Sequence, residues 1–140
     1  MIVLDTNVLS ETLRRQPDST VLAWLNAQQA ATLFISSVTV AEMLFRVAVL
    51  PEGRRRETLG QAVEELLKLF EGRILPFDTD AACHHAELAV RARLGGRGFP
   101  APDGYIAAIA GARGFSIASR DTARYEAAGL SVIDPWAWRT

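Results

Sequence analysis

The sequence predicts an α/β protein, a three-layer α/β/α sandwich with a central parallel sheet of about five strands. Along all 140 residues, short apolar runs alternate with longer amphipathic stretches. This is the pattern of parallel strands joined by helical crossovers. The first run, residues 2–4, shows no polar alternation, as expected for a strand buried on both faces. A chain of this length is expected to form a single domain, residues 1–140.

The remaining elements follow in order along the chain. The apolar runs predict strands in residues 2–4, 33–36, 74–77, 116–118 and 131–133. Between them, Asp18 or Ser19 can cap a helix that continues to residue 25. Further helices are predicted in residues 38–50, 52–71, 79–94 and 103–113, with a short one from residue 122. Gly72 and Gly114 stand where the C-caps of two of these helices are expected.

Composition and charge limit the class of protein. Apolar residues make up 49% and charged residues 22%, which is ordinary globular usage. Cys83 is the only cysteine, so no internal disulfide can form. Because the sequence shows neither a basic leader nor about 18 consecutive apolar residues, we expect a soluble, cytoplasmic protein. The net charge of -1 gives no global attraction to nucleic acid, although it is compatible with a local basic face.

Two aspartates stand at the carboxyl ends of predicted strands. Asp5 directly follows the first strand, and Asp121 follows the strand at residues 116–118 after a few polar residues. In open parallel sheets, ligands bind beyond the carboxyl ends of the strands, where the strand order reverses. The alternative is that each aspartate only caps the helix after it.

Two further acids occupy helices. Glu42 interrupts the apolar segment "VTVAEMLFRVAVL", which we expect to be buried in a core or an interface. A lone buried carboxylate is costly, so Glu42 needs a partner, either Arg46 one turn later or a metal ion. Asp103 follows Pro102 near the start of a helix, where the helix dipole alone can explain an acid.

Taken together, the four acids predict a metal centre. Two carboxylates about 5 Å apart repel by roughly 3 kcal/mol at an effective dielectric of about 20. A hard divalent ion removes this cost, and Mg²⁺ or Mn²⁺ prefers oxygen ligands. Such an ion activates water and stabilises the charge that grows on a phosphoryl group.

The blocks "IVLDTNVL", "SSVTVAEML", "APDGYIAAIA" and "IASRDTARY" resemble, in order and spacing, the four motif blocks of the PIN domain. They supply Asp5, Glu42, Asp103 and Asp121, and the likeness is greatest to the FitB-like branch of the VapC toxin ribonucleases. The resemblance implies a Mg²⁺- or Mn²⁺-dependent endoribonuclease, the toxin of a type II toxin–antitoxin system. It also implies a homodimer, a small DNA-binding antitoxin similar to VapB that inhibits the active site, and a higher assembly of the two.

The four acids and the residues near them have expected roles in such an enzyme. We expect Asp5, Asp103 and Asp121 to hold one metal ion or a pair, and Glu42 to bind a metal-linked water or the second ion. Candidates for orienting waters and carboxylates are Thr6, Asn7 and Ser119. Candidate RNA contacts are Arg120, Arg93 and Arg97, the last two in a glycine- and arginine-rich segment, residues 91–102.

One departure and two alternatives stay open. Many PIN domains carry another acid a few residues after the fourth, where this chain has Arg124 and Tyr125, so one metal is expected to be held weakly or only with RNA. A PIN-like module without activity, binding RNA or a partner, is one alternative. The other is a phosphatase of the haloacid dehalogenase type with Asp5 as nucleophile, although such enzymes carry an Asp where this chain has Asn7.

Overall fold

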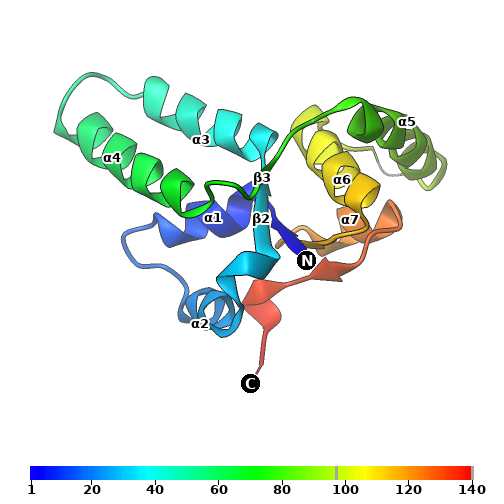
Figure 1. Cartoon of the computed structure of the whole chain (residues 1–140), viewed down its shortest axis with the longest axis horizontal. Helices are drawn as coiled ribbons and strands as arrows, with labels where there is room; N and C mark the ends of the chain where they lie inside the picture. Colours follow the sequence, from blue (N-terminus) through cyan, green and yellow to red (C-terminus); the bar gives the residue numbers. More distant parts are fainter. Residues whose placement is uncertain (97, 140) are drawn as a thin grey trace.

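A central sheet of five parallel strands organises the molecule, as predicted (Figure 1). The structure is a computed structural model that describes residues 1–96 and 98–139. In the sheet the strand order is β3-β2-β1-β4-β5. The strands are β1 (Ile2–Leu4), β2 (Leu33–Ser36), β3 (Ile74–Leu75), β4 (Ser116–Ala118) and β5 (Val132–Ile133). The two edge strands, β3 and β5, are each shorter than the strand predicted from the sequence.

The helices also follow the predicted order. They are α1 (Thr6–Thr12), α2 (Ser19–Ala27), α3 (Ser37–Ala48), α4 (Arg54–Leu69), α5 (Thr79–Leu94), α6 (Ala101–Arg113) and α7 (Thr122–Ala127), with 3-10 turns η1 (Ala30–Thr32) and η2 (Pro135–Ala137). Asp18 caps α2 by accepting from the backbone N–H groups of Thr20 and Val21. Helix α5 has its predicted bounds, and Gly114 ends α6 in the left-handed conformation that glycine adopts readily. Helix α1 was not predicted as an element.

Helices cover both faces of the sheet, so the predicted three layers are confirmed. In Figure 1, α1 to α4 lie on one side of the strands and α5 to α7 on the other. Two apolar cores result, and neighbouring residues of β1 contribute to different ones: Val3 packs with α5, α6 and α7, and Leu4 with α1 to α4. Both side chains are fully buried. This explains why β1 shows an apolar run without polar alternation.

The carboxyl end of β1 is the switch point of the sheet. Strand β1 lies between β2 and β4. The chain goes from β1 to β2 and β3 on one side and later places β4 and β5 on the other, so the strand order reverses at β1. The register pairs Leu4 with Ala118, and the next residue, Asp5, donates its N–H to the Ala118 carbonyl at 2.9 Å. The residues that follow β1 and β4 therefore face one another.

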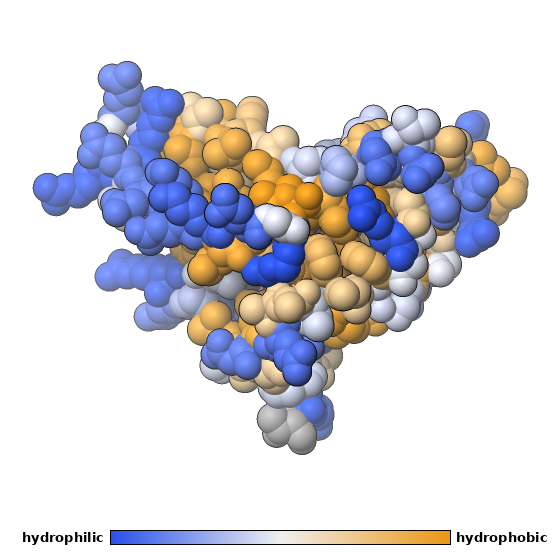
Figure 2. Space-filling model, viewed as in Figure 1, coloured by the Kyte–Doolittle hydropathy of each residue, from blue (hydrophilic) through white to orange (hydrophobic). Residues whose placement is uncertain are grey.

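One face of α3 departs from the expectation of complete burial in a core. Thr39 and Met43 are buried, but Leu44, Phe45 and Val49 are 52%, 63% and 59% exposed. Figure 2 shows the apolar surface over this helix. The alternative, that this face belongs to an interface, stays a prediction. Among the helices of residues 1–96 and 98–139, none is both long and apolar enough to cross a membrane.

Candidate active site

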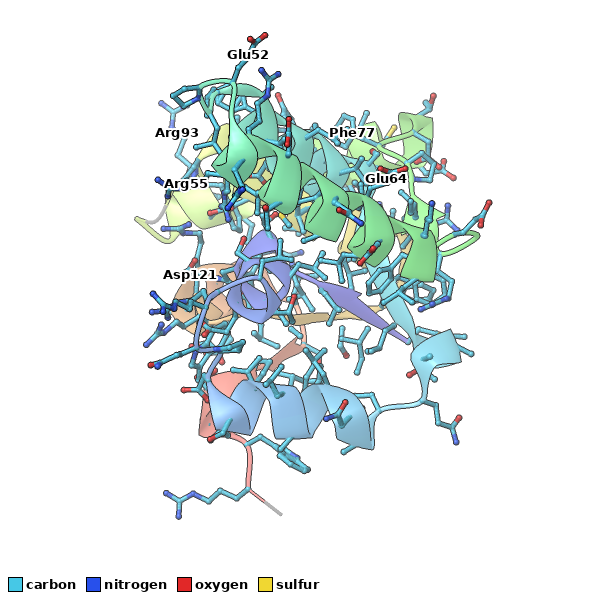
Figure 3. The ribbon with its side chains drawn as sticks, turned by 90° about the vertical axis from the view of Figure 1, so that its left-hand side faces the viewer. Glu52, Arg55, Glu64, Phe77, Arg93 and Asp121 are labelled. Atoms are coloured by element: carbon cyan, nitrogen blue, oxygen red, sulfur yellow. The ribbon has the colours of Figure 1, made fainter. Side chains whose placement is uncertain are left out.

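All four predicted acids line one cavity. The cavity has a volume of about 430 Å³ and lies at the carboxyl edge of the sheet, with Asp5, Glu42, Asp103 and Asp121 in its wall. They come from the ends of β1 and β4 and from helices α3 and α6, on both sides of the sheet. Figure 3 shows Asp121 at this edge. The convergence predicted from the sequence is therefore present in the fold.

Asp5 is the most buried of these acids, at 3% exposure. It is the N-cap of α1, with its Oδ1 accepting from the Thr6 N–H at 2.8 Å, so the capping alternative is also correct. Its Oδ2 accepts from the hydroxyls of Ser119 at 2.7 Å and Tyr125 at 3.1 Å. Burial raises the pKa of Asp5 from 3.8 to about 6, and the nearby Asp103 carboxylate adds to the increase, while these hydrogen bonds oppose it.

Glu42 is held by a chain of hydroxyl groups. The Thr6 hydroxyl donates to Glu42 Oε1 at 2.7 Å. Because that hydroxyl has a single hydrogen, its 2.9 Å contact with Thr39 must be a bond donated by Thr39. Thr39 in turn accepts from Ser36, the N-cap of α3, at 3.2 Å. The end of β2 therefore orients a carboxylate on α3 through the first residue of α1.

Asp121 is positioned by the segment that follows β1. Asn7 Nδ2 donates to Asp121 Oδ2 at 3.4 Å and to Ser119 Oγ at 3.2 Å. Ser119 Oγ also accepts from the backbone N–H of Asp121 at 3.0 Å. The Asp121 side chain makes no capping bond to α7, so capping does not account for it. Thr6, Asn7 and Ser119 thus all contact the acids that we expected them to orient.

Asp103 is paired with an arginine. It lies in the first turn of α6, and its Oδ2 accepts from Arg124 Nη1 on α7. Burial raises the pKa of the Asp103 carboxyl, and the Arg124 guanidinium acts against that rise. The helix dipole can therefore stabilise Asp103 at the start of α6, but the side chain that pairs with Asp103 is Arg124 on α7.

The cations around the cavity have separate partners. Arg120 lies over the ring of Trp136, with 5.1 Å from its Cζ to the ring centroid. Arg46 donates to Ser10 at 2.8 Å, so the alternative of an intrahelical pair with Glu42 is not what this structure shows.

The predicted RNA contacts have different placements. Arg120 is in the cavity wall. Arg93, in the last turn of α5, is exposed and lies on the same side of the molecule as Asp121 in Figure 3. Arg97 lies outside the described residues. All three assignments stay predictions.

Sequence reasoning missed Tyr125 and Thr39 among the contributors to the site. Tyr125 is fully buried and reaches Asp5 from α7. Burial is the main reason that the pKa of its phenol lies far above the ordinary value, with the Asp5 carboxylate as a further cause, so it stays a hydrogen-bond donor. Thr39 lies three residues before Glu42 on α3, and a hydroxyl one turn before an acid in an apolar helix was the available signal.

The donor set fits a hard divalent ion. The cavity offers carboxylate and hydroxyl oxygens, and none of the salt bridges among the described residues gives the buried Asp5 a cationic partner. Within the described ranges, no three acidic, histidine or cysteine side chains are arranged to ligate one ion together. Mg²⁺ commonly binds one or two carboxylates and keeps several waters. The four acids as metal ligands and catalytic groups therefore stay a prediction.

Comparison with known proteins is consistent across sequence and structure. The family model described as "PIN domain" matches residues 2–130. The chain is 50% identical to VapC ribonuclease Y4jK of Sinorhizobium fredii over 137 residues, 97% of this chain and 98% of that protein. It is 43% identical to toxin FitB of Neisseria gonorrhoeae over 137 residues, 97% and 99% of the two chains.

Among solved structures, the chain resembles one titled as FitAB bound to a DNA fragment. The TM-score is 0.94 at 42% identity, covering 100% of this chain and 99% of the other. The whole described fold, including the strands and helices that carry the four acids, thus has a close structural counterpart. On these grounds the chain belongs to the PIN domain family and, within it, to the FitB-like branch of the VapC group.

Proposed function

We propose that this protein is a Mg²⁺- or Mn²⁺-dependent endoribonuclease that hydrolyses RNA phosphodiester bonds, the toxin of a type II toxin–antitoxin system. The observation that carries the proposal is the convergence of Asp5, Glu42, Asp103 and Asp121 on one cavity at the switch point of the sheet. The relatives support it by name, since one is called a VapC ribonuclease and another a toxin. The PIN family match leaves the dehalogenase-type phosphatase without support.

Asp5, Asp103 and Asp121 would hold one metal ion or a pair, and Glu42 in the same cavity wall would bind a metal-linked water or the second ion. When bound, the ion would activate water and neutralise charge on the leaving oxygen. Ser119 and Tyr125 fix Asp5 Oδ2 by donating to it. The Thr39–Thr6 chain presents Glu42 with its Oε1 already hydrogen-bonded, which fixes the carboxylate in the cavity wall as the proposed proton acceptor for water.

The substrate must reach an acidic cavity despite its own negative charge. Arg120 lies in the cavity wall, and Arg14 and Arg46 are also in it. Guanidinium groups suit bidentate phosphate contacts. The proposal is therefore that the backbone of the RNA runs along this arginine rim, while the scissile phosphate approaches the acids. We also propose that the protein acts in the cytoplasm, where RNA, its proposed substrate, is present.

We further propose two protein partners, a small DNA-binding antitoxin and a second copy of the chain. The antitoxin is supported by the similar solved structure of FitAB bound to DNA, and the second copy is proposed from the resemblance to the family. An apolar groove also adjoins the site: Phe45, Val49 and Tyr105 line it together with Glu42 and Arg46. A peptide lying in this groove would cover Glu42 at the edge of the cavity, as expected of an inhibitory partner.

The test is RNA cleavage in vitro with purified protein. Wild type should cleave RNA with Mg²⁺ or Mn²⁺ and lose activity with EDTA. Asp103→Asn should reduce cleavage at least about a hundredfold, because a proposed metal ligand is lost and with it the stabilisation that the ion would give to the phosphoryl group. Asp80→Asn, an exposed acid in the first turn of α5, is the matched control and should keep full activity. A wild type that binds RNA but never cleaves it would favour the inactive binding module.

A further inference from the structure

The pair between Arg124 and Asp103 joins two elements that meet at the cavity. Arg124 projects from the last turn of the short helix α7 and Asp103 from the first turn of α6. The two side chains are 35% and 21% exposed, so water screens the pair only partly. Among the salt bridges of the described residues, this is the one that engages any of the four acids.

The pair reduces the net negative charge of the site. Five carboxylates line the cavity, the four predicted acids and Glu11. The guanidinium of Arg124 offsets the charge of Asp103. The cations of the cavity wall have different partners: Arg14 pairs with Glu11, Arg46 donates to Ser10, and Arg120 lies over Trp136. Arg124 is therefore the cation placed to compete with a metal ion for Asp103.

We propose that Arg124 is a built-in counterion of the metal site, which holds Asp103 in the metal-free protein and lowers the affinity of the site for a divalent cation. The proposal rests on the function proposed above. A charge-assisted hydrogen bond to a carboxylate must be given up or weakened before that carboxylate can serve an ion fully. Mg²⁺ sites commonly complete their ligand set with substrate phosphates. The arginine would thus favour metal loading together with RNA rather than before it.

The test measures Mn²⁺ binding without RNA, from the electron paramagnetic resonance signal of free Mn²⁺. The proteins are wild type, Arg124→Gln, Arg124→Lys and Arg113→Gln. Arg113 is on the same helix as Asp103 but pairs with Asp78, so its variant is the matched control. Arg124→Gln should bind Mn²⁺ about tenfold more tightly than wild type, as expected for losing one charged hydrogen bond. Arg124→Lys should fall between them, and Arg113→Gln should equal wild type.

A second arm asks whether Arg124 acts through Asp103. In an Asp103→Asn background, Arg124→Gln should change Mn²⁺ affinity by less than about threefold, because the competing pair no longer exists. An equal gain in both backgrounds would overturn the proposal in favour of a general field effect. Thermal denaturation of each variant checks that it is folded.

The remaining outcomes separate this proposal from the function on which it rests. If Arg124→Gln is folded and binds Mn²⁺ no better than wild type, the counterion role is wrong while the metal-dependent nuclease stands. Weaker binding would mean that Arg124 orients Asp103 for the ion, which also overturns the proposal. If neither protein binds Mn²⁺ at millimolar concentration, with or without RNA, the metal site itself fails.

Discussion

Asp5 should limit the stability of the metal-free protein. Burial raises its pKa from 3.8 to about 6, so between these values the folded protein keeps a proton that the unfolded chain has released. The stabilising contribution of that proton is full below about pH 4 and is lost as the pH rises through about 6. The difference of about 2.2 between the two pKa values corresponds to about 3 kcal/mol. An ionised Asp5 therefore costs the metal-free protein up to about 3 kcal/mol at neutral pH.

The substitution Asp5→Asn removes this charge and keeps the shape of the side chain. The amide oxygen can still cap α1 at the Thr6 N–H. In the wild type, the hydroxyls of Ser119 and Tyr125 donate to Asp5 Oδ2. The NH₂ group of the asparagine cannot accept these bonds, so the hydroxyls must reorient, and this lowers the gain in stability. We expect the free energy of unfolding at pH 7.5 to rise by about 1–2 kcal/mol, although cleavage of RNA is lost.

The measurement is urea denaturation in EDTA from pH 4 to pH 8. The gain should be present at pH 7.5 and absent at pH 4, where both proteins are neutral at this position. Asp80→Asn, with its exposed side chain, should change little at either pH. Adding Mg²⁺ should stabilise the wild type and leave Asp5→Asn unchanged. Equal stability of the two proteins at pH 7.5 would refute the view that Asp5 is a buried, uncompensated charge.

Three further predictions concern the supports of the site and the core. Thr39→Val should destabilise by about 1–2 kcal/mol in urea titrations, since Thr6 and Ser36 lose a buried partner, whereas Thr39→Ser should be nearly neutral; equal losses would contradict the hydroxyl chain. Tyr125→Phe removes a hydrogen bond that lowers the pKa of Asp5, so the carboxyl ¹³C titration of Asp5 should move above about 6, while Tyr105→Phe leaves it unchanged. Ile117 is fully buried in β4, so Ile117→Ala should lower the free energy of unfolding by about 2–5 kcal/mol. Leu94 is 84% exposed, so Leu94→Ala should lower it by less than about 0.5 kcal/mol. Similar losses for the two variants would contradict the burial of Ile117 in the core.

Much of the fold was predictable because its signals are local. The unbroken apolar run of β1 predicted a strand with cover on both faces, and Val3 and Leu4 lie in two different cores. Helix α1 was missed because it has only seven residues, mostly poor helix formers such as Thr6, Asn7 and Ser10. It forms because Asp5 caps it and because its apolar residues are buried in the core beneath α3.

The acids of the site were predictable, but their partners were not. Each acid stands in a short block at a strand end or a helix start, which the sequence displays directly. The partners depend on packing between distant elements. Arg46 could have paired with Glu42 by the local helix rule, yet it reaches Ser10 on α1. Arg124 reaches Asp103 only because α7 lies beside the start of α6, and no spacing rule predicts that distance.

The position of β1 between β2 and β4 has a consequence for synthesis on the ribosome. Strand β1 is made first, but one of its two neighbours is missing until residues 116–118 have been translated. Asp5 likewise waits for Ser119 and Tyr125, which are made more than a hundred residues later. A nascent chain therefore cannot assemble the proposed nuclease. The proposed activity would therefore appear only once β4 and α7 have been made and have reached β1.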